Sequence, residues 1–301
     1  MQASEEWPDK RDMDVTYSLS DLKLLTEFSD LVLEEVSFTV GLAGLNLESI
    51  AELTDVSQSA EGNPFSALQN LLAGIEVSFT VSGLSGNHDQ LDLSALHSLS
   101  AGLSLAGVNR SSQDIGLRYS HAGLRDVKGV PAELMPEHTA LGLRLYQVPV
   151  VELVLASSMG SELAQDMMLE ILSRSGSRLE LEQLEVDLPG GGITARGRAL
   201  ARSQEGGDDI EQPVLDIETD LEIRGLEHLV QAVTAQMEDE EEIQQIQAVA
   251  AFIQLAAKEE ERDGTSVHLL KIVGDSQGRI TVNDKDLAPL FTGAGDKQGK
   301  D

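Results

Sequence analysis

Hydrophobic and polar residues alternate along much of this chain with a period of two residues. Residues 35–40 have the sequence Glu-Val-Ser-Phe-Thr-Val, and residues 76–81 repeat it identically. Looser copies begin at Val15, Leu117 and Asp220. Alternation over five to eight residues is typical of a strand with one buried face. The pattern therefore predicts a repeated β unit.

A Gly-Leu pair follows several of these segments. The pairs are Gly44-Leu45, Gly83-Leu84 and Gly225-Leu226. Glycine adopts a positive φ without steric cost, so it suits a change of backbone direction. We expect each strand to end at its glycine and the leucine to return to the core.

Two further segments indicate hairpins. In the first, from Leu179 to Ala201, the apolar positions shift by one residue near Gln183, as they do at a β-bulge. Its turn is Pro189–Gly192. The second hairpin pairs residues 267–273 with residues 279–282.

Helical spacing of apolar residues appears in three segments. It predicts helices over Ser161–Ser173, Leu226–Met237 and Ile243–Ala257. The stretch from Ser203 to Gln212 is polar and rich in glycine, and we expect a loop there.

These elements predict an α+β fold dominated by β structure. Repeated antiparallel strand units form a curved sheet, and a few amphipathic helices pack on one side of it. We expect residues 1–292 to form a single elongated domain, with sub-units at 13–130 and 131–292. Residues 293–301 are expected to be a disordered tail.

Composition excludes several classes of function. The chain has 52 acidic and 21 basic residues, a formal net charge of −31 and no cysteine. Such a charge repels nucleic acids and anionic membrane surfaces. The absence of cysteine excludes disulfides, thiolate catalysis and cysteine-ligated metals. No apolar run reaches the ~20 residues of a membrane span.

Motifs that would carry catalysis do not stand out. The six histidines are scattered without metal-ligand spacing. The glycines at 190–192 lead into an expected strand, whereas a phosphate-binding loop leads into a helix. No Gly-x-Ser-x-Gly elbow occurs. We therefore expect no enzyme activity, no cofactor and no structural metal.

The apolar faces of the two identical segments are the candidate site. Their side chains share one side of each strand because they are two residues apart. They would line an open groove that holds lipid, or form a closed core. These residues are Val36, Phe38, Val40, Val77, Phe79 and Val81.

The order of elements after residue 115 resembles a known group of proteins. A strand pair, a strand opening a helix at Gly225-Leu226, a second helix and the closing segment Gly278–Asn283 are shared with bacterial envelope proteins of the YdgA-like kind. These proteins are in turn similar in style to the AsmA and TamB group. The resemblance implies a periplasmic or envelope location, and it carries no catalytic residues over to this chain.

Two locations remain open. The first dozen residues are polar and contain no signal-peptide core. We expect either a cytoplasmic protein or an envelope protein whose export segment is missing upstream. The expected function is that of a non-enzymatic envelope protein, with lipid or envelope proteins as partners. The alternative is a protein-interaction scaffold that has a closed core and no small-molecule ligand.

Overall fold

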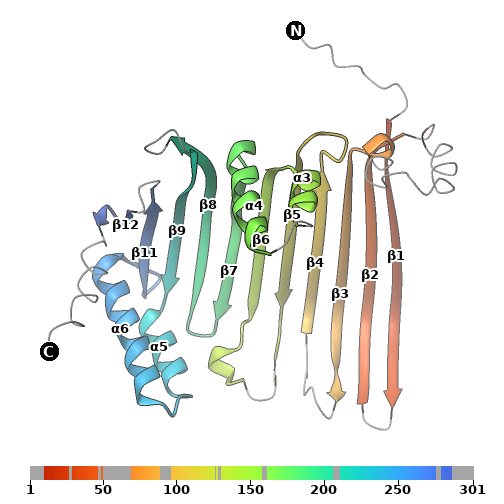
Figure 1. Ribbon diagram of the computed structural model, residues 1–301. Coiled ribbons are helices and arrows are strands. Elements are labelled where there is room, and N and C mark those ends of the chain that lie inside the picture. The colour runs from red at the N-terminus through yellow and green to blue at the C-terminus, as the bar shows by residue number, and fades with distance from the viewer. Residues whose placement is uncertain are drawn as a thin grey trace.

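The computed structural model describes residues 10–26, 29–46, 49, 69–88, 96–125, 127, 130–157, 161–205, 211–275 and 279–286. Within these ranges thirteen strands form one open sheet (Figure 1). Strands β1 to β9 lie side by side in chain order, followed by β11, β12 and β13, and β10 also pairs with β11. Every neighbouring pair for which a register is assigned is antiparallel. The expected β-dominated fold with a curved sheet is confirmed.

The first nine strands are long and form most of the sheet. They are β1 Lys10–Thr26, β2 Ser29–Asn46, β3 Gly74–His88, β4 Leu96–Ala106, β5 Gln113–Ala122, β6 His138–Val148, β7 Arg178–Leu188, β8 Gly191–Glu205 and β9 Glu211–Arg224. The remaining strands are shorter. They are β10 Lys258–Arg262, β11 Thr265–Gly274, β12 Ile280–Val282 and β13 Lys285–Asp286.

Four α-helices and a short 3-10 helix are described, and the α-helices lie on one side of the sheet (Figure 1). The predicted helices appear as α4 Ser161–Ser175, α5 Leu226–Thr234 and α6 Glu240–Ala256. The two others are α3 Val150–Ser157 and the 3-10 helix η1 Ala132–Leu134. The Asp239 side chain caps α6 by accepting a hydrogen bond from the Glu241 backbone at 2.8 Å.

Both expected hairpins are present. Strands β7 and β8 pair around the turn at Pro189-Gly190, and their register shifts between Leu181 and Leu184. The predicted bulge at Gln183 is therefore confirmed. Strands β11 and β12 form the second hairpin, in which Ile272 pairs with Val282.

The Gly-Leu pairs behave as expected in conformation but not in position. Gly44, Gly83 and Gly225 have φ values of 60°, 61° and 63°. Gly225 does end β9 and begins α5, and Leu226 is buried. Gly44 and Gly83, however, lie inside β2 and β3, so the prediction that they end a strand was wrong. Pairing with the neighbouring strands resumes beyond each glycine, so the backbone continues through a local irregularity.

The expected loop over Ser203–Gln212 was also wrong at both ends. Strand β8 continues to Glu205 and β9 begins at Glu211, and these two residues pair with each other. Polar composition does not prevent pairing here because the hydrogen bonds of the ladder are made by the backbone. The expected tail at 293–301 lies outside the described residues.

The main buried cluster lies at one end of the sheet. It joins α5 and α6 to the strands beneath them, through Ile223, Leu226, Leu229, Ala256 and Leu270. These helices therefore cover the end of the sheet that contains β8, β9 and β11.

Candidate functional site: an open apolar sheet face

The six predicted site residues lie together. Phe38 pairs directly with Phe79, and the flanking valines pair in the same register, Val36 with Val81 and Val40 with Val77. All six therefore point to one face of the sheet, as their alternation predicted.

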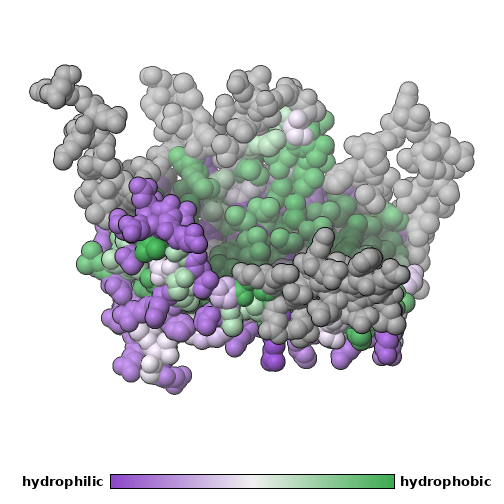
Figure 2. All heavy atoms as spheres, turned by 90° about the horizontal axis from the view of Figure 1, so that it is seen from below, coloured by the Kyte–Doolittle hydropathy of each residue, from purple (hydrophilic) through white to green (hydrophobic). Residues whose placement is uncertain are grey.

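The same face continues across the sheet. Following the paired residues from β1 to β11 gives one row of ten side chains, none of them charged. The row is Tyr17, Phe38, Phe79, Ala101, Tyr119, Leu141, Leu184, Ala195, Leu221 and Leu270. We call this side of the sheet the apolar face. Figure 2 shows hydrophobic side chains gathered in the hollow above the sheet and hydrophilic ones along its opposite side.

Much of the apolar face is open to solvent. Phe38 is 42% exposed and Phe79 is 38% exposed, although Val81 is buried. Every strand from β1 to β7 presents at least one exposed large hydrophobic side chain on this face. They include Leu19, Phe38, Phe79, Leu103, Leu117, Leu145 and Leu179. The face is therefore not sealed in the way a closed core is.

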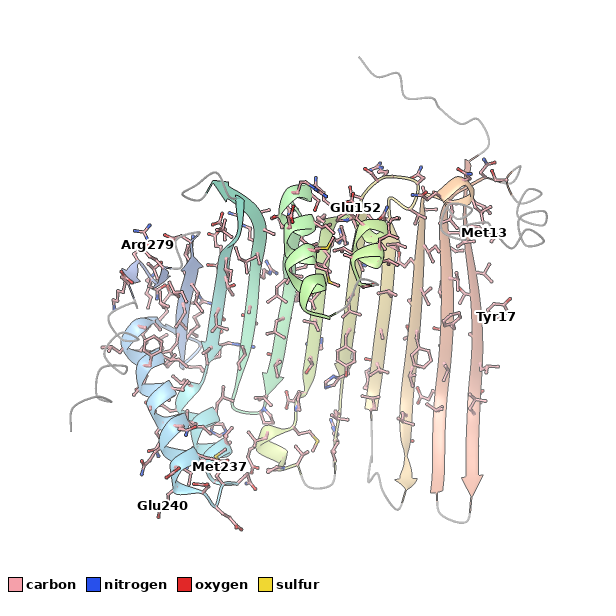
Figure 3. The ribbon with its side chains drawn as sticks, in the orientation of Figure 1. Met13, Tyr17, Glu152, Met237, Glu240 and Arg279 are labelled. Carbon is pink, nitrogen blue, oxygen red and sulfur yellow. The ribbon has the colours of Figure 1, made fainter. Side chains whose placement is uncertain are left out.

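The free edge at β1 is the most exposed part. Tyr17 is 70% exposed and extends from β1 at the edge of the sheet (Figure 3). Sequence reasoning recognised the strand that begins at Val15 but did not place Tyr17 in the site. Its pairing with Phe38 places it there, and the matching alternation of the two segments was the available signal.

The opposite face is polar. Beside the hydrophobic row, the neighbouring positions on β1 to β5 are hydroxyl residues. They are Ser18, Ser37, Thr80, Ser100 and Ser120. Toward β9 and β11 this face carries ion pairs, for example Arg198 with Glu218 at 2.7 Å and Lys271 with Glu218 at 2.8 Å. Hydrogen bonds from Lys271 and Arg198 lower the pKa of the Glu218 carboxyl.

Two buried histidines lie on the apolar face, His121 on β5 and His268 on β11, where His268 pairs with Ile223. His121 is buried and pairs with Leu99 of β4, in the row next to the central one. The Nδ1 atom of His121 lies 3.1 Å from the Tyr119 hydroxyl, whereas its Nε2 atom has no hydrogen-bond partner among the described residues. Burial, and to a smaller extent the nearby His138, lowers the pKa of His121. The ring is therefore neutral at pH 7.

One cluster on β6 and β7 has the residue types of a metal site. Ligand atoms of His138, Glu185 and Asp187 all lie within 4.8 Å of one another. Both carboxylates already accept hydrogen bonds, Asp187 from Arg224 and Glu185 from Gln183. A divalent cation would compete with these partners, so the described arrangement is that of an ion-pair network.

A hollow of about 710 Å³ lies on the polar side of the sheet. Its lining contains equal numbers of acidic and basic side chains. Three of its arginines form ion pairs. These pairs are Arg178 with Glu180, Arg198 with Glu218 and Arg202 with Asp216. An anion that bound to one of these three arginines would have to displace the acid already paired with it.

Comparisons with protein-family models, with curated proteins and with solved structures found no significant match. Among the described residues, no helix is both long and apolar enough to span a membrane.

Proposed function

We propose that this protein is a non-enzymatic protein of the bacterial cell envelope that binds lipid along the apolar face of its sheet. The observation that carries the proposal is the exposure of that face from β1 to β7. The size of the exposed face supports the proposal. Six strand steps of ~4.8 Å and about 20 Å of strand length give roughly 600 Å². This equals the upper end of the largest apolar patches on monomeric proteins, about 300–600 Å².

The chemistry of the face suits an acyl chain. An acyl chain has no hydrogen-bonding groups along its length, so it loses nothing when it lies against valine, leucine and phenylalanine side chains. Transfer of apolar surface out of water supplies roughly 25 cal/mol per Å² to binding. A polar substrate would instead need hydrogen-bond partners, which Val36, Phe38 and Phe79 do not offer.

A fluorescent fatty-acid probe tests the proposal. We expect the wild-type protein to bind the probe and Phe79→Asp to bind it at least ten-fold more weakly, because the new carboxylate must stay hydrated. Thr80→Asp is the matched control, since Thr80 is the next residue on β3 and faces the polar side. Absence of probe binding by the wild type, or equal binding by Phe79→Asp, would contradict the proposal.

The envelope location rests on the resemblance of residues 115–291 to YdgA-like proteins. Fractionation of cells that produce the native protein from its own gene tests it. Recovery in the periplasmic or membrane fraction supports the location, and recovery in the cytoplasm alone contradicts it.

The alternative function is a protein-interaction scaffold. It is favoured by the free edge of β1, a 17-residue strand that pairs only with β2 among the described strands. Unpaired edges bind additional strands through backbone hydrogen bonds. If Phe79→Asp unfolds the protein and the wild type binds no probe, the scaffold is the function that remains.

A further inference from the structure

An apolar pocket lies between the sheet and the helix pair α5–α6, away from the six predicted residues. It has a volume of about 400 Å³. Ile193 of β8 and Ile223 of β9 contribute its floor, and α5 and α6 contribute residues such as Val233 and Val249. Gln245 is the single polar side chain among the lining residues.

The pocket belongs to the same face as the exposed hydrophobic row. Ile193 pairs with Ile223 and with Val186, and continuing through the paired residues of β6, β5 and β4 leads to Val81 on β3. The pocket therefore lies on the same side of the sheet as the exposed hydrophobic row.

Helix α6 covers the pocket loosely. Of its 17 residues only Ala256 is buried, and Val249, which lines the pocket, is 58% exposed. The wall of the pocket formed by α6 is therefore partly open to solvent.

We propose that this pocket holds the end of a single acyl chain. The inference rests on the proposed function, because it names where the end of an acyl ligand of the apolar face binds. The occupant follows from the lining. A peptide brings backbone N–H and C=O groups that need partners, and the lining offers only Gln245 for them.

The size of the pocket supports the same occupant. One turn of an α-helix, about 10–12 Å wide with its side chains and 5.4 Å long, fills roughly 400–600 Å³. The pocket would therefore hold at most one turn of a partner helix. A flexible acyl chain can fill the same volume by folding back on itself.

The pocket and Phe79 are separate parts of the face. Strands β3 and β8 are five strand steps apart, or roughly 24 Å. Substitutions at Phe79 and in the pocket therefore perturb different contacts, so the proposed function and this inference can fail independently.

Titration calorimetry with saturated fatty acids of increasing length tests the pocket. Each added methylene that enters it should tighten binding about fourfold, until the pocket is full. Val249→Trp fills part of the pocket, so we expect the increase to stop at a shorter chain and long-chain binding to weaken at least ten-fold. Leu255→Trp is the matched control, because Leu255 is 77% exposed on the same helix and does not line the pocket.

A second measurement uses the introduced indoles directly. Fatty acids brominated near the methyl end should quench the fluorescence of Val249→Trp and not that of Leu255→Trp, after subtraction of the wild-type signal from Trp7. Circular dichroism checks that both variants fold. If Val249→Trp is unfolded, Val233→Trp on the facing helix α5 takes its place in both measurements.

The outcomes separate the two proposals. If the wild type binds fatty acid, Phe79→Asp weakens it and Val249→Trp behaves like Leu255→Trp, the pocket assignment is overturned and the proposed function stands. If only the pocket variant weakens binding, the pocket stands and the wider face does not. A pocket that binds an apolar helical peptide and no fatty acid overturns the inference.

Discussion

Truncation of Phe79 tests whether the apolar face is open. With 38% of its surface exposed, Phe79 has about three-fifths of its surface out of water. Full burial of such a side chain contributes roughly 1.5–3 kcal/mol, so Phe79→Ala should cost about 1–2 kcal/mol of unfolding free energy. A phenylalanine enclosed in a core would instead cost about 3–5 kcal/mol when cut to alanine.

Leu270→Ala provides the internal comparison. Leu270 lies on the same face, but α5 and α6 cover it and it is only 5% exposed. Its truncation should cost roughly 2–5 kcal/mol, because it removes buried methyl groups and leaves a cavity. Phe79→Ala should therefore be the milder change although the residue removed is larger.

Urea denaturation followed by far-ultraviolet circular dichroism measures both variants. Equal denaturant slopes would show that the two substitutions act on the same transition. A loss of about 3–5 kcal/mol for Phe79→Ala, equal to or above that of Leu270→Ala, would refute the open face.

Three further substitutions test the local structure. Gly225→Ala should destabilise the protein well beyond Gly264→Ala. Both glycines have a positive φ, which costs about 1–2 kcal/mol for alanine. A Cβ at Gly225 would also collide with the Gly190 carbonyl, whereas no described atom lies within 4 Å of a Cβ at Gly264. Asp239→Ala should cost about 0.5–2 kcal/mol by removing the cap of α6, measured by thermal unfolding. Burial lowers the pKa of His121 in the folded state below its usual value of 6.5. The stability that depends on the neutral ring is therefore complete above pH 6.5 and is lost as the pH falls below that value. His121→Gln should therefore lose less unfolding free energy than the wild type when the pH is lowered from 7.5 to 5.5. An equal loss in both proteins would contradict the lowered pKa of His121.

Alternation was sufficient to predict strands β2 and β3 and the face that their side chains share, whereas β4, Leu96–Ala106, was not predicted. In a strand the side chains alternate strictly between the two faces, so Phe38 and Phe79 had to share a face with their neighbouring valines once the strands paired. The one-residue shift near Gln183 was visible for the same reason, since a bulge changes the phase of the pattern.

Other elements lack a signal of this kind. Helix α3, Val150–Ser157, has an almost continuous apolar sequence, which fits a buried strand as well as a helix. Strand β10, Lys258–Arg262, consists entirely of charged residues. It forms because the following β11 offers backbone partners, from Leu269 opposite Lys258 to Thr265 opposite Arg262.

The extent of exposure could not be deduced from the pattern. A closed core and an open face have the same alternation, because both need apolar residues on one side of each strand. The difference depends on where the helices pack. The pocket beneath α6 was missed for the same reason, since Ile246, Val249 and Ile253 also have the spacing of an ordinary packed helix.

Charge distinguishes between the partners that could cover this face. Two copies of the chain that stacked their apolar faces would bring two net charges of −31 together, and the resulting repulsion opposes association. An acyl chain carries no charge along its length and meets no such barrier. The opposite face of the sheet carries hydroxyl residues and ion pairs such as Arg198–Glu218, which keep that face hydrated. The distribution of charge therefore favours an uncharged chain over a second copy as the ligand of the apolar face.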